Sequence, residues 1–188
     1  MIQLCSESPR RIEILNQFKI DFSIIKSKLK SEPTFSGGNI NTFIRNLSKL
    51  KGRSALPESS DWILTADTLV LMNNTVLGKP KSLCEATKML RQLSGKTHRV
   101  ITAICFTCPI TNQQYSRSST TIITFKKLKR DNIENYVYSK HPLDKAGGYG
   151  LQELPNDFIA SRQGCYFNVV GLPIYSVLRL AKSCDILL

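Results

Sequence analysis

MIQLCSESPRRIEILNQF, residues 1–18, is the stretch that decides the fold class. Its run Ile2-Gln3-Leu4 predicts a short strand. The segment from about Pro9 to Phe18 predicts a helix, because its apolar side chains recur at helical spacing. The side chains expected to face inward are Ile12, Leu15 and Phe18. A strand followed at once by a helix is typical of an α/β protein.

The remaining sequence continues this alternation of short apolar runs and helical segments. Further strands are expected at Phe22–Ile25, Ile63–Met72, Val76–Leu77, Arg99–Phe106 and Thr120–Phe125. Further helices are expected at Ile40–Arg53, from Ser82 to a stop at Gly95, at Asp131–Ser139 and after Pro173. Ser82 and Glu85 form a capping-box pattern at the start of the second of these helices. A basic polar loop at 26–39 and a glycine-rich loop at 147–150 separate the other elements.

Length and composition indicate one globular domain spanning residues 1–188. A single core serves a chain of 188 residues, and 41% hydrophobic with 21% charged residues is ordinary for a folded protein. The first residues lack the apolar stretch of a signal sequence, and no run approaches the roughly 20 apolar residues of a membrane span. We therefore expect a cytoplasmic protein with no membrane partner.

The cysteines and the net charge narrow the choice of function less than the length and composition do. The six cysteines are scattered, so we expect them to be reduced. Cys105 and Cys108 form a C-x-x-C without a second ligand pair, which favours a strand ending at Pro109 and leaves a metal or redox role as the alternative. The net charge of +12 attracts nucleic acid, an anionic membrane or a polyanionic small substrate, and charge alone does not choose among them.

The segment Ser6-Glu7-Ser8-Pro9-Arg10-Arg11 has the composition of an anion site. Ser8 is suited to cap the first helix and Pro9 to begin it, while free amides and two guanidiniums offer donors to a phosphate. The alternative is a capped helix that carries two solvated arginines.

Asp67 is a carboxylate inside the otherwise apolar run WILTADTLVLM. Burying an unpaired charge costs several kcal/mol, so a metal ion, a lysine or an activated water is expected to compensate it. The alternative is an ordinary exposed strand residue.

Other candidate ligands are spread along the chain. Lys51, Lys79 and Lys145 are candidate phosphate ligands, although single lysines are mostly surface residues. In the glycine-rich segment Asp144–Gln152, glycines permit close backbone approach to a ligand, and Gln152 offers both a donor and an acceptor to a base edge. A plain glycine-rich turn is the alternative there.

Taken in order, these segments resemble the Maf family of nucleoside triphosphate pyrophosphatases over nearly the whole chain. LCSESPRRIEIL is similar to the family's opening L-A-S-x-S-P-R-R-x-E-L-L, and TADTLVL with LGKP to its A-D-T and G-K-P core. LRQLSGKTHRVITAICF is similar to L-S-G-x-x-H-x-V-x-T. KAGGYGLQ and GCYFNVVGLP are similar to the closing K-A-G-x-Y-G-x-Q and N-V-x-G-L-P. Each motif alone is weak, but five in order are specific.

The resemblance implies a Maf/ITPase-like fold, in which an elongated mixed β-sheet is flanked by helices and a substrate cleft lies between two lobes, often in a homodimer. It also implies hydrolysis of a nucleoside triphosphate to the monophosphate and pyrophosphate with a divalent cation, Mg or Mn, as house-cleaning of the nucleotide pool. Asp67 matches the family's proposed proton acceptor. The residues that match its polar cleft are Ser8, Arg10, Arg11, Lys51, Lys79 and Lys145.

Within the family, Arg10, Thr68 and Gln152 are similar to the specificity positions of the dTTP/UTP pyrophosphatase branch. A second branch, which prefers 7-methyl-GTP, typically replaces that arginine by tryptophan. Canonical or modified pyrimidine nucleotides are therefore the expected substrates.

Three positions depart from the family pattern. Its acidic V-D-E-like segment is replaced by residues 28–32, KLKSE, in which only Glu32 is acidic. The usual K-A is Lys51-Gly52, and the glycine that commonly follows Gln152 is Glu153. Asp67 and Glu32 are the expected metal ligands. These changes bear on rate and metal affinity more than on the fold.

An ordinary aspartate, with a pKa of about 3.9, is a poor base at neutral pH. Asp67 therefore needs a raised pKa or a metal-bound water, and we expect the metal, because the surrounding cations lower the pKa of a carboxylate. The rival function is a catalytically weakened Maf-like protein that acts as a nucleotide- or nucleic-acid-binding regulatory factor. The basic stretch at 126–130 lacks the interleaved aromatics of a nucleic-acid module, so the enzyme is favoured.

Overall fold

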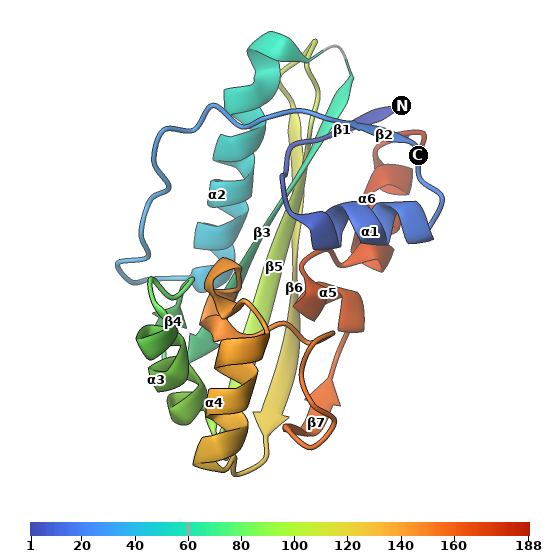
Figure 1. Cartoon of the computed structure of the whole chain (residues 1–188). Helices are drawn as coiled ribbons and strands as arrows, with labels where there is room; N and C mark the ends of the chain where they lie inside the picture. The colour runs from blue at the N-terminus through green and yellow to red at the C-terminus, as the bar shows by residue number, and fades with distance from the viewer. Residues whose placement is uncertain (60) are drawn as a thin grey trace. The chain divides into compact units, whose positions relative to one another are not determined.

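The computed structural model describes residues 1–59 and 61–188. Its strands are β1 (Ile2–Leu4), β2 (Phe22–Ile24), β3 (Trp62–Met72), β4 (Thr75–Leu77), β5 (Thr97–Thr107), β6 (Gln114–Phe125) and β7 (Ile159–Gln163) (Figure 1). Its α-helices are α1 (Pro9–Gln17), α2 (Ile40–Ala55), α3 (Leu83–Leu93), α4 (Arg130–Ser139), α5 (Tyr166–Val170) and α6 (Ile174–Ser183). Short 3-10 turns lie at Leu56–Glu58, Pro142–Asp144 and Ala146–Gly148.

Within the described residues the strands form one open, mixed sheet of seven strands, in the order β2-β1-β3-β5-β6-β7, with β4 paired to β3 outside this path. β1 runs parallel to both β2 and β3. β4 is antiparallel to β3 across the turn at Asn73 and Asn74, which both have positive φ, and β7 is antiparallel to β6. The expected α/β class, with a mixed sheet flanked by helices, is confirmed.

The chain divides into two compact units. Unit 1 comprises Met1–Asp67, Thr102–Ser119 and Gly171–Leu188, and unit 2 comprises Thr68–Ile101 and Thr120–Val170. β3, β5 and β6 therefore each contribute to both units. The single domain spanning 1–188, and the cleft that the resemblance implies, stay predictions.

In unit 1, the β1-α1-β2 segment forms as the opening sequence predicts. Pro9 occupies the first position of α1, and Ile14 and Leu15 are its buried side chains. Ile12 and Phe18, expected to face inward, are only half-buried. The fully buried part of α1 is therefore limited to Leu15, as expected, and Ile14, which was not.

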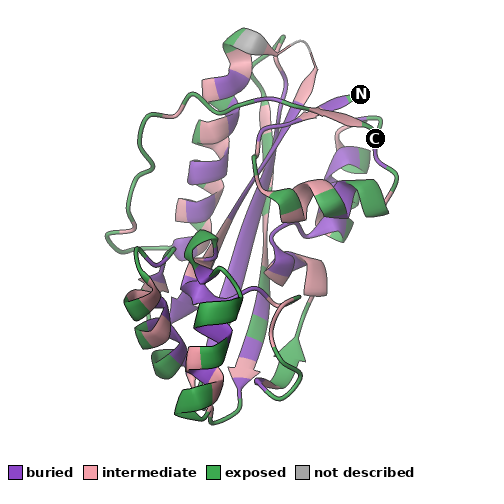
Figure 2. Ribbon diagram, in the orientation of Figure 1, coloured by how far each residue is buried: buried purple, intermediate pink, exposed green. Residues whose placement is uncertain are grey.

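In unit 2, α3 and α4 cover a core of apolar side chains around Leu90, Phe125, Tyr136, Tyr149 and Phe158. Figure 2 shows how much of β3 and β5 is buried, which fits their continuous apolar runs. Ser82 caps α3 by accepting from the amide of Glu85, but the carboxylate of Glu85 accepts from Lys81 instead of Ser82, so only half of the capping box forms.

The sequence missed two short elements, β7 and α5. β7 has no apolar run because four of its five residues are exposed, and α5 is only 5 residues long. Among the described residues, no helix is long and apolar enough to cross a membrane. The six cysteines are all free thiols, as expected, and β5 ends just after the C-x-x-C begins.

Candidate functional site

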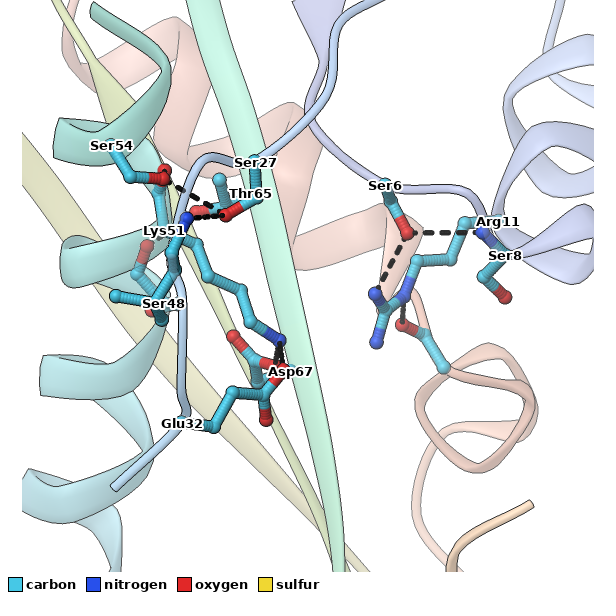
Figure 3. Close-up of polar contacts among 12 residues, drawn as sticks. Ser6, Ser8, Arg11, Ser27, Glu32, Ser48, Lys51, Ser54, Thr65 and Asp67 are labelled. Atoms are coloured by element: carbon cyan, nitrogen blue, oxygen red, sulfur yellow. Dashed lines mark hydrogen bonds and ion pairs between the residues drawn. The ribbon is translucent and has the colours of Figure 1, made fainter. Parts of the chain in front are cut away.

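Asp67 lies on β3 in unit 1 and is only 5% exposed, so it is not an ordinary exposed strand residue. Its Oδ1 accepts a hydrogen bond from Nζ of Lys51, which reaches it from α2 (Figure 3). The side chain of Lys51 is itself 15% exposed. The compensating group required by a carboxylate in an apolar strand is therefore a lysine.

The pairing of Lys51 with Asp67 follows from how α2 lies against β3. The hydroxyl of Thr65 donates to the carbonyl of Ser48 over 2.8 Å, in buried surroundings. Residues two apart share one face of a strand, and residues three apart share one face of a helix. Asp67 therefore shares a face of β3 with Thr65, and Lys51 shares a face of α2 with Ser48. The hydrogen bond between Thr65 and Ser48 shows that these two faces meet.

Gly52 sets how closely α2 approaches β5. A Cβ at this position would lie 2.3 Å from Oγ1 of Thr107, closer than real atoms come. Thr107 is fully buried, and its hydroxyl accepts from Nε2 of Gln114 over 3.0 Å. The same amide nitrogen donates to the carbonyl of Lys49 over 2.8 Å. The glycine after Lys51 is thus matched to a threonine on the facing strand.

Glu32 belongs to the same cluster. Its Oε1 lies 2.8 Å from Nζ of Lys51, so one ammonium joins Asp67 and Glu32 (Figure 3). The loop that carries Glu32 is tied to α2, since the hydroxyls of Ser27 and Ser54 lie 2.9 Å apart and the amide of Lys28 donates to Ser54 over 3.2 Å. Glu32 and Asp67 therefore lie on the same ammonium, and joint action of the two carboxylates stays a prediction.

Burial raises the pKa of Asp67, and this effect exceeds the opposing attraction of Lys51 and Arg11. Our expectation that the surrounding cations would keep this pKa low is therefore wrong. The sequence shows which charged residues belong to the site but not how deeply Asp67 is buried, and burial has the largest effect on its pKa. Oδ2 of Asp67 is buried and has no hydrogen-bond partner. Asp67 thus has one oxygen held by Lys51 and one buried oxygen without a hydrogen-bond partner.

The predicted anion segment is also ordered, but differently from the simplest prediction. Ser8 occupies the N-cap position of α1, yet its side chain makes no cap hydrogen bond. The guanidinium of Arg11 donates to Oγ of Ser6 over 3.0 Å and to the carbonyl of Gly171 over 2.9 Å (Figure 3). Arg11 is therefore a fixed cation rather than a solvated one. Arg10, next to it, is half-buried.

Sequence reasoning assigned no role to Ser6 or Gly171, the two groups that orient Arg11. Ser6 was part of the predicted anion segment, but Gly171 is 160 residues from Arg11 along the chain. No local pattern carries such a contact. The pairing of a serine and a backbone carbonyl with one guanidinium becomes visible only in the fold.

Unit 2 contains the other predicted ligands, Thr68, Lys79, Lys145 and Gln152. Lys79 and Gln152 are exposed, whereas Lys145 is 5% exposed. The amide of Gly147 donates to the carbonyl of Gly78 over 2.9 Å, so the segment that carries Lys79 lies beside the glycine-rich segment. Gly147 has a φ of 71°, and a Cβ there would lie 3.0 Å from Val70. This close approach accounts for the glycine.

A family model described as Maf-like protein matches residues 1–184. The chain belongs to the Maf family.

Similar proteins of this family bear the name dTTP/UTP pyrophosphatase. One from Clostridium perfringens strain SM101 is 36% identical over 186 residues, covering 97% of this Maf chain and 96% of the relative. One from Thermosipho africanus is 41% identical over 176 residues, covering 94% and 89%. One from Bdellovibrio bacteriovorus is 38% identical over 186 residues, covering 96% of each.

Among solved structures, a nucleoside-triphosphatase / dITP/XTP pyrophosphatase from Mycobacterium abscessus matches this Maf chain with a TM-score of 0.47 at 12% identity, over 68% of this chain and 75% of that chain. The family assignment does not depend on this distant likeness.

The carboxylates of this Maf protein suit a divalent cation in composition. Within residues 1–59 and 61–188, no group of three or more His, Cys, Asp or Glu side chains could hold a metal ion. Asp67 and Glu32 nevertheless converge on Lys51, so their carboxylates lie within reach of each other. Mg²⁺ commonly binds through one or two carboxylates and the phosphates of its substrate. Two carboxylates are therefore a sufficient protein contribution.

Proposed function

We propose that this Maf protein hydrolyses a nucleoside triphosphate, with dTTP and UTP as the favoured substrates, to the monophosphate and pyrophosphate. The observation that carries this proposal is the state of Asp67: buried, with a raised pKa, and with one oxygen left without a partner. A carboxylate in that state is a stronger base than an ordinary aspartate, and so is better suited to take a proton from water. The names of the relatives support the choice of pyrimidine nucleotides.

In the proposed reaction, Arg10, Arg11 and Lys51 bind phosphate oxygens and offset their charge. Water attacks the α-phosphorus in line with the departing pyrophosphate. A new P–O bond forms, the bond from the α-phosphorus to the bridging oxygen breaks, and pyrophosphate leaves with the electron pair. Oδ2 of Asp67 takes the proton of the attacking water.

Asp67 and Glu32 are the residues that would hold a divalent cation in this protein. When bound, such an ion lowers the pKa of its water and neutralises phosphate charge. The chain's own part is to keep the two carboxylates within reach of each other, and the ion pairs of Lys51 do this. Mg or Mn is the ion that we propose.

The other predicted ligands keep their proposed roles in substrate binding. Ser8 offers a hydroxyl that makes no cap bond, and Lys79 is an exposed cation. Lys145 is assigned to phosphate, whereas Thr68 and the exposed Gln152 are assigned to the base. Replacing Gln152 by alanine is expected to relax base preference more than it lowers turnover of a poor substrate. A homodimer and a cytoplasmic location also belong to this proposal.

The deciding experiment is to incubate the purified protein with each NTP and dNTP, with and without Mg²⁺ or Mn²⁺, and to assay pyrophosphate. Release from dTTP and UTP that needs the metal supports the proposal. A protein that binds these nucleotides but releases no pyrophosphate would instead be the regulatory binding factor. Release of orthophosphate alone would place the cleavage between the β and γ phosphates and would contradict the proposal.

A further inference from the structure

The ammonium of Lys145 in unit 2 has three oxygen partners within the protein. Its Nζ donates to the carbonyl of His141 over 2.9 Å and to Oδ1 of Asp144 over 2.8 Å, and it lies 3.2 Å from Oε1 of Glu153. An ammonium has three donors and no acceptor. A phosphate oxygen that approaches Lys145 therefore competes with two hydrogen bonds and one ion pair.

Lys145 cannot easily turn toward another ligand. Its side chain is 5% exposed, and a Cβ at Gly150 would lie 2.8 Å from its Cε, so the stem runs directly over the backbone of Gly150. Gly150 is fixed in turn, because its amide donates to the hydroxyl of Tyr136 over 2.9 Å. When Lys145 exchanges a partner for a phosphate, it is therefore one of the three acceptors that must move.

Among the three acceptors, Glu153 is the one suited to leave. The carbonyl of His141 is part of the main chain, and Asp144 is the neighbour of Lys145 in sequence with the shorter contact. Glu153 makes the longest contact, and its side chain is 33% exposed. A turn from the amide of Glu153 to the carbonyl of Gly150, at 3.0 Å, keeps it close by when its carboxylate swings away.

The charges of this cluster also oppose an anion. One ammonium and two carboxylates sum to one negative charge, where a triphosphate needs a positive one. We infer that Glu153 competes with the phosphates of the substrate for the ammonium of Lys145, and so lowers the affinity of this protein for triphosphates. The inference rests on the proposed function, in which Lys145 is a phosphate ligand.

The test compares Glu153→Gln with the wild type in calorimetric binding of two probes, inorganic tripolyphosphate and a dTTP analogue with a non-hydrolysable α–β bridge. We expect the Kd of E153Q to fall about threefold to fivefold, the scale of a partly exposed ion pair. Glu134→Gln is the matched control, since that carboxylate is 34% exposed and pairs with Arg91 and Arg130 instead. Its Kd is expected to stay at the wild-type value.

Two further variants separate competition from general charge. In a Lys145→Met background, E153Q is expected to change neither Kd. Where Lys145→Met fails to fold by circular dichroism, Glu153→Asp decides, because it keeps the charge and is too short to hold Lys145. A Kd lower than the wild type for E153D supports the competition.

An E153Q protein whose Kd is unchanged or raised, especially with a lower unfolding temperature, would make Glu153 a structural partner of Lys145 and overturn the inference. That result leaves the proposed function standing if the wild type still releases pyrophosphate. A wild type that binds neither probe overturns both.

Discussion

Lys51 in unit 1 and Lys145 in unit 2 are each joined to two carboxylates, yet the two clusters differ in depth. Asp67, the partner of Lys51, has a side chain that is only 7% exposed, whereas the partners of Lys145, Asp144 and Glu153, are 52% and 33% exposed. In unit 1 the carboxylate is buried and its pKa is raised. In unit 2 the ammonium is buried instead. The same set of charges is therefore proposed to serve a proton transfer in one unit and phosphate affinity in the other.

The largest expected effect comes from removing the buried carboxylate of unit 1. Asp67→Asn keeps the shape of the side chain but cannot accept the proton of water, so kcat is expected to fall by about 10²- to 10⁴-fold. Steady-state pyrophosphate release measures this. Thermal unfolding at or above the wild-type temperature shows that the loss is chemical. Activity within tenfold of the wild type would remove Asp67 from the centre of the reaction.

In unit 2, a buried histidine is expected to make stability depend on pH. His98 is 2% exposed, pairs with the hydroxyl of Tyr149 over 2.6 Å, and has a pKa lowered by burial from 6.5 to about 4. Between these two values the unfolded chain binds more protons than the folded one, so stability is lost as the pH falls through that window. The loss is about 3 kcal/mol when complete.

The control for this prediction is His98→Gln, which keeps a hydrogen-bonding group for Tyr149 but does not titrate. The difference in unfolding free energy between wild type and H98Q, from urea titrations at several pH values, is expected to change between pH 6.5 and pH 4 and to be constant above it. A constant difference over the whole range would contradict a neutral buried His98. Asp67 has the opposite sign: because its folded pKa is raised, its contribution to stability falls as the pH rises through that pKa.

The position of Lys51 depends on the close approach of α2 to β5, which Gly52→Ala is expected to disturb. The new Cβ would overlap Oγ1 of Thr107, and overpacking of this kind costs about 1 to 3 kcal/mol. Thr107→Ala removes the overlapping oxygen, so the double variant is expected to be more stable than G52A alone. Denaturant unfolding of all four proteins measures the coupling. Additive effects would show that the helix shifts without meeting Thr107.

A smaller effect is expected from the exposed partner of Lys51. Glu32→Gln removes one of the two proposed metal ligands, so the Mg²⁺ concentration for half-maximal pyrophosphate release is expected to rise about tenfold. Saturating Mg²⁺ is expected to restore most of kcat. Glu7→Gln is the control, since Glu7 is an exposed carboxylate of unit 1 that pairs with Lys26. An unchanged Mg²⁺ requirement in E32Q would leave Asp67 as the sole protein ligand.

Sequence predicted the elements of this fold better than the partners of its charged groups. Periodicity located the β1-α1-β2 opening, and an aspartate in an apolar strand was enough to require a compensating charge. It could not select Lys51, because that contact joins residues 16 apart on a helix and a strand. The sequence indicated cations near Asp67 but not the burial that outweighs them. The pKa of Asp67 was therefore predicted to be low, whereas it is raised.

The physical reasons for the three departures from the family pattern also became visible only in the fold. Glu32 was a lone acid in a basic loop, and only its ion pair with Lys51 gives it a place. Gly52 has a reason once Thr107 is seen opposite, and Glu153 once its contact with Lys145 is known. Each depends on a contact distant in sequence or on a side chain folding back, which one-dimensional patterns do not contain.

The enclosed setting of Lys145 has a chemical consequence as well as an electrostatic one. A reagent that acylates an amine must reach the nitrogen, and the side chain of Lys145 is only 5% exposed, with three oxygens around its Nζ. Acylating reagents that label the exposed Lys79 will therefore pass over Lys145 in the resting protein. The reactivity of a single amine thus becomes a direct report on whether Glu153 is in place.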